Sequence, residues 1–357
     1  AQYSFENVFQ YNEGDIYWCT ADIGWITGHS YIIYGPLLSG ATTVMFEGVP
    51  TYPDAGRFWE IVEKNNINIF YTAPTAIRSL EAMGNDYVRK YNLNSLKVLG
   101  TVGEPINEDA WNWYFKEIGG NRAPIVDTWW QTETGGIMIS NLAGINKAKA
   151  TFATLPLPGI EACVVDENGE EMKKNNIEGK LCIKFPWPSI ARTIYGDHQR
   201  FINTYFSAFP GKYFSGDGCY KNKDGLFRIT GRVDDVLIVS GHNLGTAEIE
   251  SAIDEHENVC ESAIVGYPHQ IKGNGVFAYV ICHHKPKDEK TINIEINNLI
   301  TRHVGPIAKV DKFLYVDGLP KTRSGKIMRR ILRKIASKDY SNLGDTSTLL
   351  DPNVVEN

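Results

Sequence analysis

The first 133 residues alternate between short apolar runs and segments whose apolar residues recur at helical spacing. The apolar runs are rich in strand-forming residues and occupy 15–21, 41–48, 67–74, 96–105 and 124–133. The helical patterns occupy 28–40, 54–66, 75–84 and 107–120. Strands that alternate with helices favour an open parallel sheet. Ligands of such sheets bind at the carboxyl ends of the strands, so we expect a site in the turns that follow them.

The pattern changes twice further along the chain. Short strands, with Asn-Gly and Asp-Gly hairpin signals at 168–169 and 224–225, indicate a β-subdomain. A smaller α+β pattern follows, and the end of the chain is polar. We therefore predict an α/β fold in which residues 1–233 form a large domain, with a mostly parallel sheet flanked by helices plus the β-subdomain. Residues 234–340 form a small α+β domain, and residues 341–357 a polar tail.

Composition narrows the class of protein. A net charge of −6 argues against a chain that binds nucleic acid as a whole. The six cysteines lack metal-ligand spacing, which indicates structural thiols in a reducing compartment. No apolar run has membrane-spanning length and no signal peptide opens the chain. We therefore expect a cytoplasmic protein without a membrane partner, with the nucleus or mitochondrion as alternatives if the source is eukaryotic. The chain begins without Met and in mid-pattern, and we expect it to be a fragment.

Two polar turns follow predicted strands. In TVGEP at 101–105, Gly103 allows a flat base to approach the backbone, and Pro105 stiffens the turn. DTWWQTETGG at 127–136 combines an acid, hydroxyls, aromatic rings and a glycine pair. A strand that runs into a glycine turn, with two core tryptophans, also explains this second stretch. The presence of both turns favours a ligand site.

Two later stretches supply groups suited to a nucleotide. Asp217 lies between glycines in YFSGDG, and a carboxylate there can accept hydrogen bonds from both hydroxyls of a ribose. Arg232 in ITGRVDD has a planar fork suited to ribose or phosphate oxygens. The alternative interpretations are an ordinary turn aspartate and a surface ion pair.

The basic stretch LPKTRSGKIMRR at 319–330 is not a P-loop. Pro320 occupies the position of the first glycine, and Ile327 follows the lysine where Ser or Thr is required. Lys326, on a glycine-flanked loop, is nevertheless suited to contact an anion. A solvated start of a basic helix, or a nucleic-acid patch, is the alternative.

In this order, the motifs resemble the adenylate-forming superfamily. The resemblance to acetyl-CoA synthetases rests on GDIYWCTADIGWITGHSYIIYGPL, YTAPTAIR, VGEPIN, DTWWQTETGG, YFSGDG, ITGRVDDVLIVSGH, LGTAEIE and PKTRSGKIMRRILRKIA. It covers essentially the whole chain and the C-terminal half or so of such an enzyme. It implies an acetate–CoA ligase that uses ATP and Mg²⁺ to join acetate to coenzyme A through an acetyl-adenylate, with a mobile small domain.

The resemblance implies roles for individual residues. Positions that match nucleotide contacts are Gly103, Glu104, Pro105, Asp127, Thr128, Trp129, Gln131, Thr132, Asp217, Arg232 and Asn243. Positions that match the wall of the acyl pocket are Trp25, Ile26, Thr27, Val102 and Trp130. Positions that match contacts to coenzyme A are Thr27, Thr51, Ser240 and Gly241.

Other positions match the moving parts and the metal sites. Lys326 matches the lysine that acts in adenylation, Asp234 the hinge, and Glu133 a position near the Mg²⁺ bound with ATP. A peripheral metal site of bacterial relatives is matched by Asp254, His256 and Val259. A lone surface histidine is the alternative for that last feature. The resemblance also implies an acetyltransferase and a deacetylase that act on Lys326.

The sequence departs from the family at three points. The phosphate loop rich in Gly, Ser and Thr, expected just before residue 1, is not in the chain, so we expect the chain alone to be inactive. Asn243 stands where an arginine usually touches phosphate. Thr51 stands where bacterial relatives have an asparagine.

Trp130 carries the expectation that acetate is the substrate. An indole that fills the pocket leaves room for acetate and excludes larger acyl groups, because packed interiors do not yield cheaply. The nearest alternative is a propionyl-CoA synthetase or another short-chain ligase, which should carry a smaller residue there. An alternative of a different class is a non-catalytic module that binds nucleic acid through residues 321–334.

Overall fold

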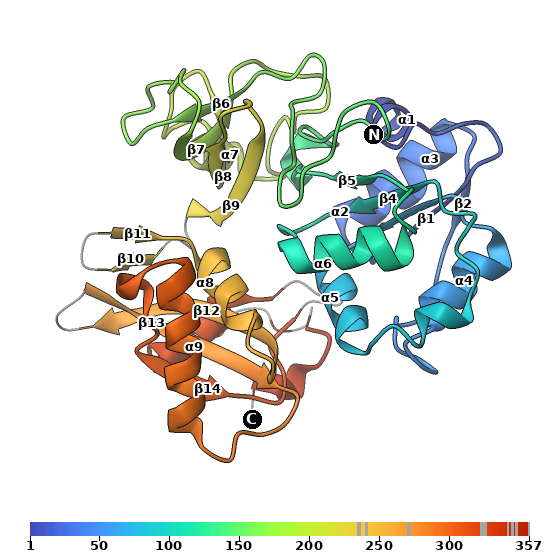
Figure 1. Ribbon diagram of the computed structural model, residues 1–357. Helices are drawn as coiled ribbons and strands as arrows, with labels where there is room; N and C mark the ends of the chain where they lie inside the picture. Colours follow the sequence, from blue (N-terminus) through green and yellow to red (C-terminus); the bar gives the residue numbers. More distant parts are fainter. Residues whose placement is uncertain are drawn as a thin grey trace. The chain divides into compact units, whose positions relative to one another are not determined.

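The computed structural model describes residues 1–233, 237–239, 242–269, 273–321, 327–340, 343, 346 and 349–355. The chain forms two compact units, Ala1–Ile229 and Thr230–Asn357, and each is described by itself (Figure 1). The predicted boundary after residue 233 falls within the first residues of the second unit. Within the described ranges, every helix is too short or too polar to cross a lipid bilayer.

A five-stranded parallel sheet forms the centre of the first unit. Its strand order is β2-β1-β3-β4-β5, and each neighbouring pair is parallel, which confirms the predicted parallel sheet. The strands are β1 (Ile16–Cys19), β2 (Thr42–Val44), β3 (Ile69–Thr72), β4 (Val98–Thr101) and β5 (Ile125–Asp127). The helices include α1 (Gln2–Phe9), α2 (Ile26–Gly28), a π-helical segment (His29–Tyr34), α3 (Gly35–Leu38), α4 (Arg57–Asn65), α5 (Pro74–Ala82) and α6 (Glu108–Trp113), which a second π-helical segment (Tyr114–Ile118) continues.

Helices cover both faces of this sheet. Successive residues of a strand point to opposite faces, so neighbours in one strand belong to different cores. Trp18 and Phe70 pack into an apolar core with residues of α4, α5 and α6. Their neighbours Tyr17 and Tyr71 pack into a second core with residues of α1. A sheet that is apolar on both faces leaves the ends of its strands as the place for polar chemistry.

The second strand is shorter than its apolar run predicted. β2 ends at Val44, although the run extends over 41–48. Met45 is 62% exposed, and Phe46 instead packs edge-on against Trp18 and Phe58. The apolar character of this run therefore serves the packing of a loop as well as a strand.

A four-stranded sheet follows in the order β6-β7-β8-β9. Its strands are β6 (Ala162–Val165), β7 (Ile177–Ile183), β8 (Tyr213–Lys221) and β9 (Phe227–Arg232), and α7 (His198–Tyr205) precedes β8. Gly169 and Gly225 have φ of +84° and +79°, the conformation that glycine supplies at tight turns. Both predicted hairpin signals are therefore turns that precede the next antiparallel segment.

The second unit contains a sheet of order β11-β10-β13-β12, with β14 parallel to β13. Its strands are β10 (Leu237–Val239), β11 (His242–Leu244), β12 (Val259–His269), β13 (Gly273–Cys282) and β14 (Lys312–Tyr315). Its helices are α8 (Thr246–Asp254), α9 (Glu289–His303) and α10 (Arg329–Ala336). Ile264 packs with α8 and α9, whereas its neighbour Ala263 packs with α10, so helices cover both faces (Figure 1).

Candidate active site

Three neighbouring strands end on polar residues that lie side by side. Because β3, β4 and β5 are parallel and in register, Thr72 pairs with Thr101, and Thr101 pairs with Asp127. Thr20, which follows β1, extends this row, since its hydroxyl lies 2.6 Å from that of Thr72. The row lies at the carboxyl ends of the strands, where parallel sheets bind their ligands. The two predicted strand-end turns therefore leave the sheet at the same edge.

Asp127 lies buried at the base of this edge. Its carboxylate accepts a hydrogen bond from the Thr101 hydroxyl at 2.7 Å, and burial raises the pKa of Asp127 to about 6. The buried Thr128 hydroxyl donates to the carbonyl of Thr101 at 2.8 Å and is hydrogen-bonded to the Tyr71 phenol at 2.6 Å. These contacts fix β5 to β4 at the point where the chain leaves the sheet.

The turn after β4 presents open backbone. Gly103 is exposed with φ +98°, and a Cβ placed there would meet no atom within 4 Å. Val102, before it, is buried in the core beneath the sheet edge. Glu104 directs its carboxylate to α5, where Arg78 donates to Oε1 at 2.9 Å. The backbone at Gly103 is thus open, whereas the Glu104 side chain is engaged with α5.

A second polar group joins the turn after β5 to the β-subdomain. Trp129 Nε1 and Gln131 Nε2 donate to the same oxygen of Asp217, at 3.0 and 2.9 Å. Gln131 also donates to the carbonyl of Ser215 at 2.8 Å and accepts from the Tyr213 phenol at 2.7 Å. Trp129, Gln131 and Asp217, all predicted nucleotide residues, are therefore in direct contact. Trp129 and Asp217 are 88 positions apart in the sequence.

Glu133 belongs to the same local structure. Its carboxylate accepts a hydrogen bond from the phenol of Tyr205 in α7. The Tyr205 ring stacks on Tyr213 with centroids 5.4 Å apart and an angle of 13° between the ring planes. Thr132 is exposed between Gln131 and Glu133. The Tyr205–Tyr213 stack therefore supports both residues that flank Thr132.

The predicted acyl-pocket residues divide into two groups. Trp130 is half-buried and packs edge-on against Tyr31, with centroids 4.9 Å apart and an interplanar angle of 77°. Val102 belongs to the same core as these two rings. The remaining predicted wall residues lie at the start of α2. Trp25 is exposed there, and its neighbours Ile26 and Thr27 are half-buried.

Other predicted residues lie elsewhere or outside the described ranges. Pro105 is exposed, and Thr51 is half-buried in the turn after β2. Arg232 is exposed at the end of β9, in the second unit, and the side chain of Asn243 is outside the described part of β11. The positions that the structure does not describe are Asp234, Ser240, Gly241 and Lys326.

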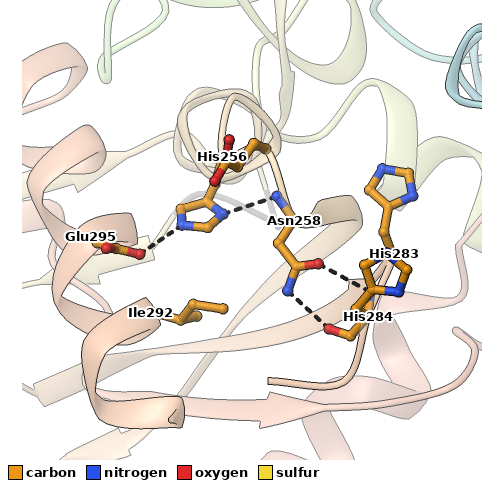
Figure 2. A pocket seen from close by; sticks show the side chains of 7 residues that line it. His256, Asn258, His283, His284, Ile292 and Glu295 are labelled. Atoms are coloured by element: carbon orange, nitrogen blue, oxygen red, sulfur yellow. Dashed lines mark hydrogen bonds and ion pairs between the residues drawn. The ribbon is translucent and has the colours of Figure 1, made fainter. Parts of the chain in front are cut away.

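Of the predicted peripheral metal residues, His256 lines a pocket in the second unit (Figure 2). His256 Nε2 lies 3.1 Å from Glu295, and the backbone N–H of Asn258 donates to its Nδ1 at 3.2 Å. Asp254 accepts from a serine hydroxyl of β12 at 2.7 Å, and the His256 carbonyl accepts from the N–H of Val259 at 2.8 Å. Within the ranges described, no three His, Cys, Asp or Glu side chains are placed to share a metal ion. This metal assignment stays a prediction.

Comparison with sequence families places the chain. The profile of the family described as AMP-binding enzyme matches residues 1–195, and that of the AMP-binding enzyme C-terminal domain matches residues 248–326. The chain belongs to the AMP-binding enzyme family.

Individual relatives agree with this family. The acetyl-coenzyme A synthetase of Alkalilimnicola ehrlichii is 58% identical over 98% of the chain and 54% of its own length. That of Sinorhizobium medicae is 58% identical over 100% of the chain and 55% of its own length. The chain thus spans about half the length of the curated relatives it matches.

A solved structure has the same fold. The anthranilate CoA ligase AuaEII, in complex with anthranoyl-AMP, superposes with a TM-score of 0.80 over 95% of this chain and 63% of that protein. Its sequence is 23% identical. The likeness confirms the predicted α/β fold.

Sequence reasoning missed three side chains of this sheet edge. Tyr31 buries its phenol against the Ser4 hydroxyl at 2.7 Å and the N–H of Ile137 at 2.6 Å, while its ring holds Trp130. Arg78 and Tyr205 bind carboxylates that the sequence had singled out. None of the three lies in a polar turn, so local composition gave no signal for them.

The raised pKa of Asp127 predicts a pH-dependent stability. The folded state disfavours the charged carboxylate, so the penalty is absent below the ordinary pKa of 3.8 and fully present above about pH 6. Asp127→Asn keeps an acceptor for Thr101 without the charge. Relative to wild type, its free energy of unfolding should therefore improve between pH 4 and pH 7 by on the order of 2 kcal/mol.

Urea unfolding at both pH values, followed in the first unit, would measure this difference. Asp86→Asn removes an exposed carboxylate and is the matched control. If Asp127→Asn changed the free energy of unfolding equally at pH 4 and pH 7, the raised pKa of Asp127 would be contradicted.

Proposed function

We propose that this protein is an acetate–CoA ligase. It converts acetate, ATP and coenzyme A to acetyl-CoA, AMP and pyrophosphate through an acetyl-adenylate. The observation that carries the proposal is 56–58% identity, over 98–100% of the chain, to proteins named acetyl-coenzyme A synthetase. The polar groups gathered at the carboxyl edge of the parallel sheet support it.

The nucleotide lies along this edge. The backbone of Gly103 and the turn to Pro105 take the adenine, since the positive φ and open space at Gly103 suit a flat ring. Asp217 takes the ribose, because its carboxylate is oriented by two neutral donors, Trp129 and Gln131. Thr132, exposed beside them, faces phosphate. Asp127 and Thr128 hold the two strands at the spacing that this binding requires.

Mg²⁺ fits the donor set near Glu133. Hard cations of this kind bind one or two carboxylates together with substrate phosphates and water. Glu133 is half-buried, and Tyr205 fixes its orientation through one carboxylate oxygen. When bound with ATP, Mg²⁺ supplies charge neutralisation for the phosphates.

The reaction has two steps. A carboxylate oxygen of acetate attacks the α-phosphorus of ATP, and the bond to pyrophosphate breaks. The sulfur of coenzyme A, having lost its proton, then attacks the acyl carbon, and the bond to AMP breaks. Trp130, held by Tyr31, closes the end of the acyl pocket, so that a two-carbon acid fits.

The small domain contributes to both steps. The family resemblance assigns Lys326 to adenylation, Asp234 to the hinge between the domains, and Ser240 and Gly241, with Thr27 and Thr51, to coenzyme A. Arg232 and Asn243 complete the nucleotide contacts. Acetylation of Lys326 would remove its charge and stop adenylation, so an acetyltransferase and a deacetylase are the proposed regulatory partners.

Pyrophosphate release tests the function directly. The protein at its natural length should release pyrophosphate with acetate and ATP, and form acetyl-CoA when coenzyme A is added. Acetate should give the highest kcat/KM in a series of acetate, propionate and butyrate. A higher kcat/KM for propionate would identify a propionate ligase, and no release with any short carboxylate would refute the proposal.

Trp130→Gly should change the choice of carboxylate. Removal of the indole opens the end of the pocket, so the kcat/KM ratio of butyrate to acetate should rise by at least about tenfold. Trp113→Ala removes an indole that packs with the core of the opposite sheet face, and it controls for lost packing. An unchanged ranking of the three acids would show that Trp130 does not limit chain length.

Lys326→Ala should separate the two half-reactions. Loss of the ammonium should slow acetyl-adenylate formation by about 10²–10³-fold, because the charge that develops on phosphate loses a partner. Attack of coenzyme A on supplied acetyl-adenylate should be nearly unchanged. Equal losses in both half-reactions would instead assign Lys326 to the fold.

A further inference from the structure

The carboxylate of Glu104 is fixed to the first turns of α5. Its Oε1 accepts hydrogen bonds from the Thr75 hydroxyl and from an Arg78 guanidinium nitrogen, the latter at 2.9 Å. Arg78 also donates to the Thr75 hydroxyl at 3.1 Å. The side chains of Arg78 and Glu104 are only 19% and 25% exposed. The three side chains thus form one mutually bonded group.

The topology of the sheet produces this group. β3 and β4 are neighbours, and the N–H of Val102 still bonds to the carbonyl of Thr72 at 3.1 Å beyond the last paired residues. The helix that follows β3 therefore begins next to the turn that follows β4. Thr75 and Arg78 are three positions apart in α5, so they lie on the same face of the helix and both reach the turn.

The turn needs such an attachment. Gly103 lies immediately before Glu104 and has φ +98°, a region in which glycine is not confined by a side chain. A charge-assisted hydrogen bond between partly buried groups is stronger than a neutral one. The bonds to Glu104 therefore restrain the backbone that glycine leaves free.

We propose that Arg78, together with Thr75, is a positioning residue that holds Glu104 and thereby orders the Gly103 backbone for the adenine of ATP. This inference rests on the proposed function, because it takes the turn as the adenine site. Arg78 does not touch the nucleotide. It acts on binding of the base through Glu104, and recognition of acetate does not depend on it.

The surroundings of Arg78 agree with a structural cation. Burial, together with the nearby Asp109, raises the pKa of Glu81 to about 7, and Arg78 opposes that rise. The guanidinium therefore lies within the field of two carboxylates, those of Glu81 and Glu104. Lysine at this position would keep the charge but not the delocalised guanidinium, one nitrogen of which donates to both Glu104 and Thr75.

Nucleotide binding and steady-state kinetics of the protein at its natural length test the proposal. Arg78→Ala should raise the Kd for ATP, measured by calorimetry, and the KM for ATP by about tenfold. The KM for acetate and kcat should stay within about twofold. The preference for ATP over GTP, as a ratio of kcat/KM, should fall. Arg78→Lys should give an intermediate result.

A double variant and a control sharpen the test. If Arg78 acts through Glu104, Arg78→Ala combined with Glu104→Ala should weaken ATP binding no more than the worse single variant. Arg57→Ala breaks a more exposed Arg–Glu pair on the neighbouring α4 and should leave every constant unchanged.

The outcomes separate this inference from the proposed function. An unchanged Kd for ATP in Arg78→Ala, additive effects in the double variant, or equal losses in kcat and in both KM values would each overturn it. Absence of ATP binding by the wild-type protein would overturn it as well. If wild type binds ATP but rejects acetate, the proposed activity fails, and the effect of Arg78→Ala on the Kd for ATP still decides the inference.

Discussion

The in-register pairing of three parallel strands determines where this protein can carry out chemistry. Thr72, Thr101 and Asp127 end β3, β4 and β5 at the same level. Below that level both faces of the sheet are apolar, so a polar group inside would lack partners. Asp127 is buried next to this level. The Thr101 hydroxyl offsets only part of the free-energy cost of burying its charge, and burial raises its pKa to about 6. The turns above this level can carry polar residues without that penalty.

Side chains join the β-subdomain to the sheet edge, in addition to isolated backbone bridges such as that between Thr154 and Phe227 of β9. Asp217 lies in β8, and it binds the indole of Trp129 and the amide of Gln131 in the turn after β5. The Tyr205–Tyr213 stack adds a second connection through Glu133 and the same amide. Movement of β8 would therefore disturb the ribose and phosphate positions of the proposed site together.

The sequence predicted what local patterns encode and missed what depends on distant partners. Alternating strand and helix periods gave the parallel sheet, because burial on both faces imposes those periods. The same reasoning overestimated β2, since Phe46 is apolar but packs from a loop. The polar turns were found, yet no local signal paired Trp129 with Asp217 or Arg78 with Glu104. Those partners are brought together by strand order, which the periodicity of a single segment does not specify.

The partners of the carboxylates distinguish their roles. A hydroxyl orients Asp127, a phenol orients Glu133, and an indole with an amide orients Asp217. These donors are neutral, so each of these bonds fixes the direction of a carboxylate without adding a charge of its own. Glu104 differs because a guanidinium bonds to it and offsets its charge. A carboxylate whose charge is offset gives little attraction to a new ligand, but it makes a firm attachment, which agrees with the anchoring role proposed for Glu104.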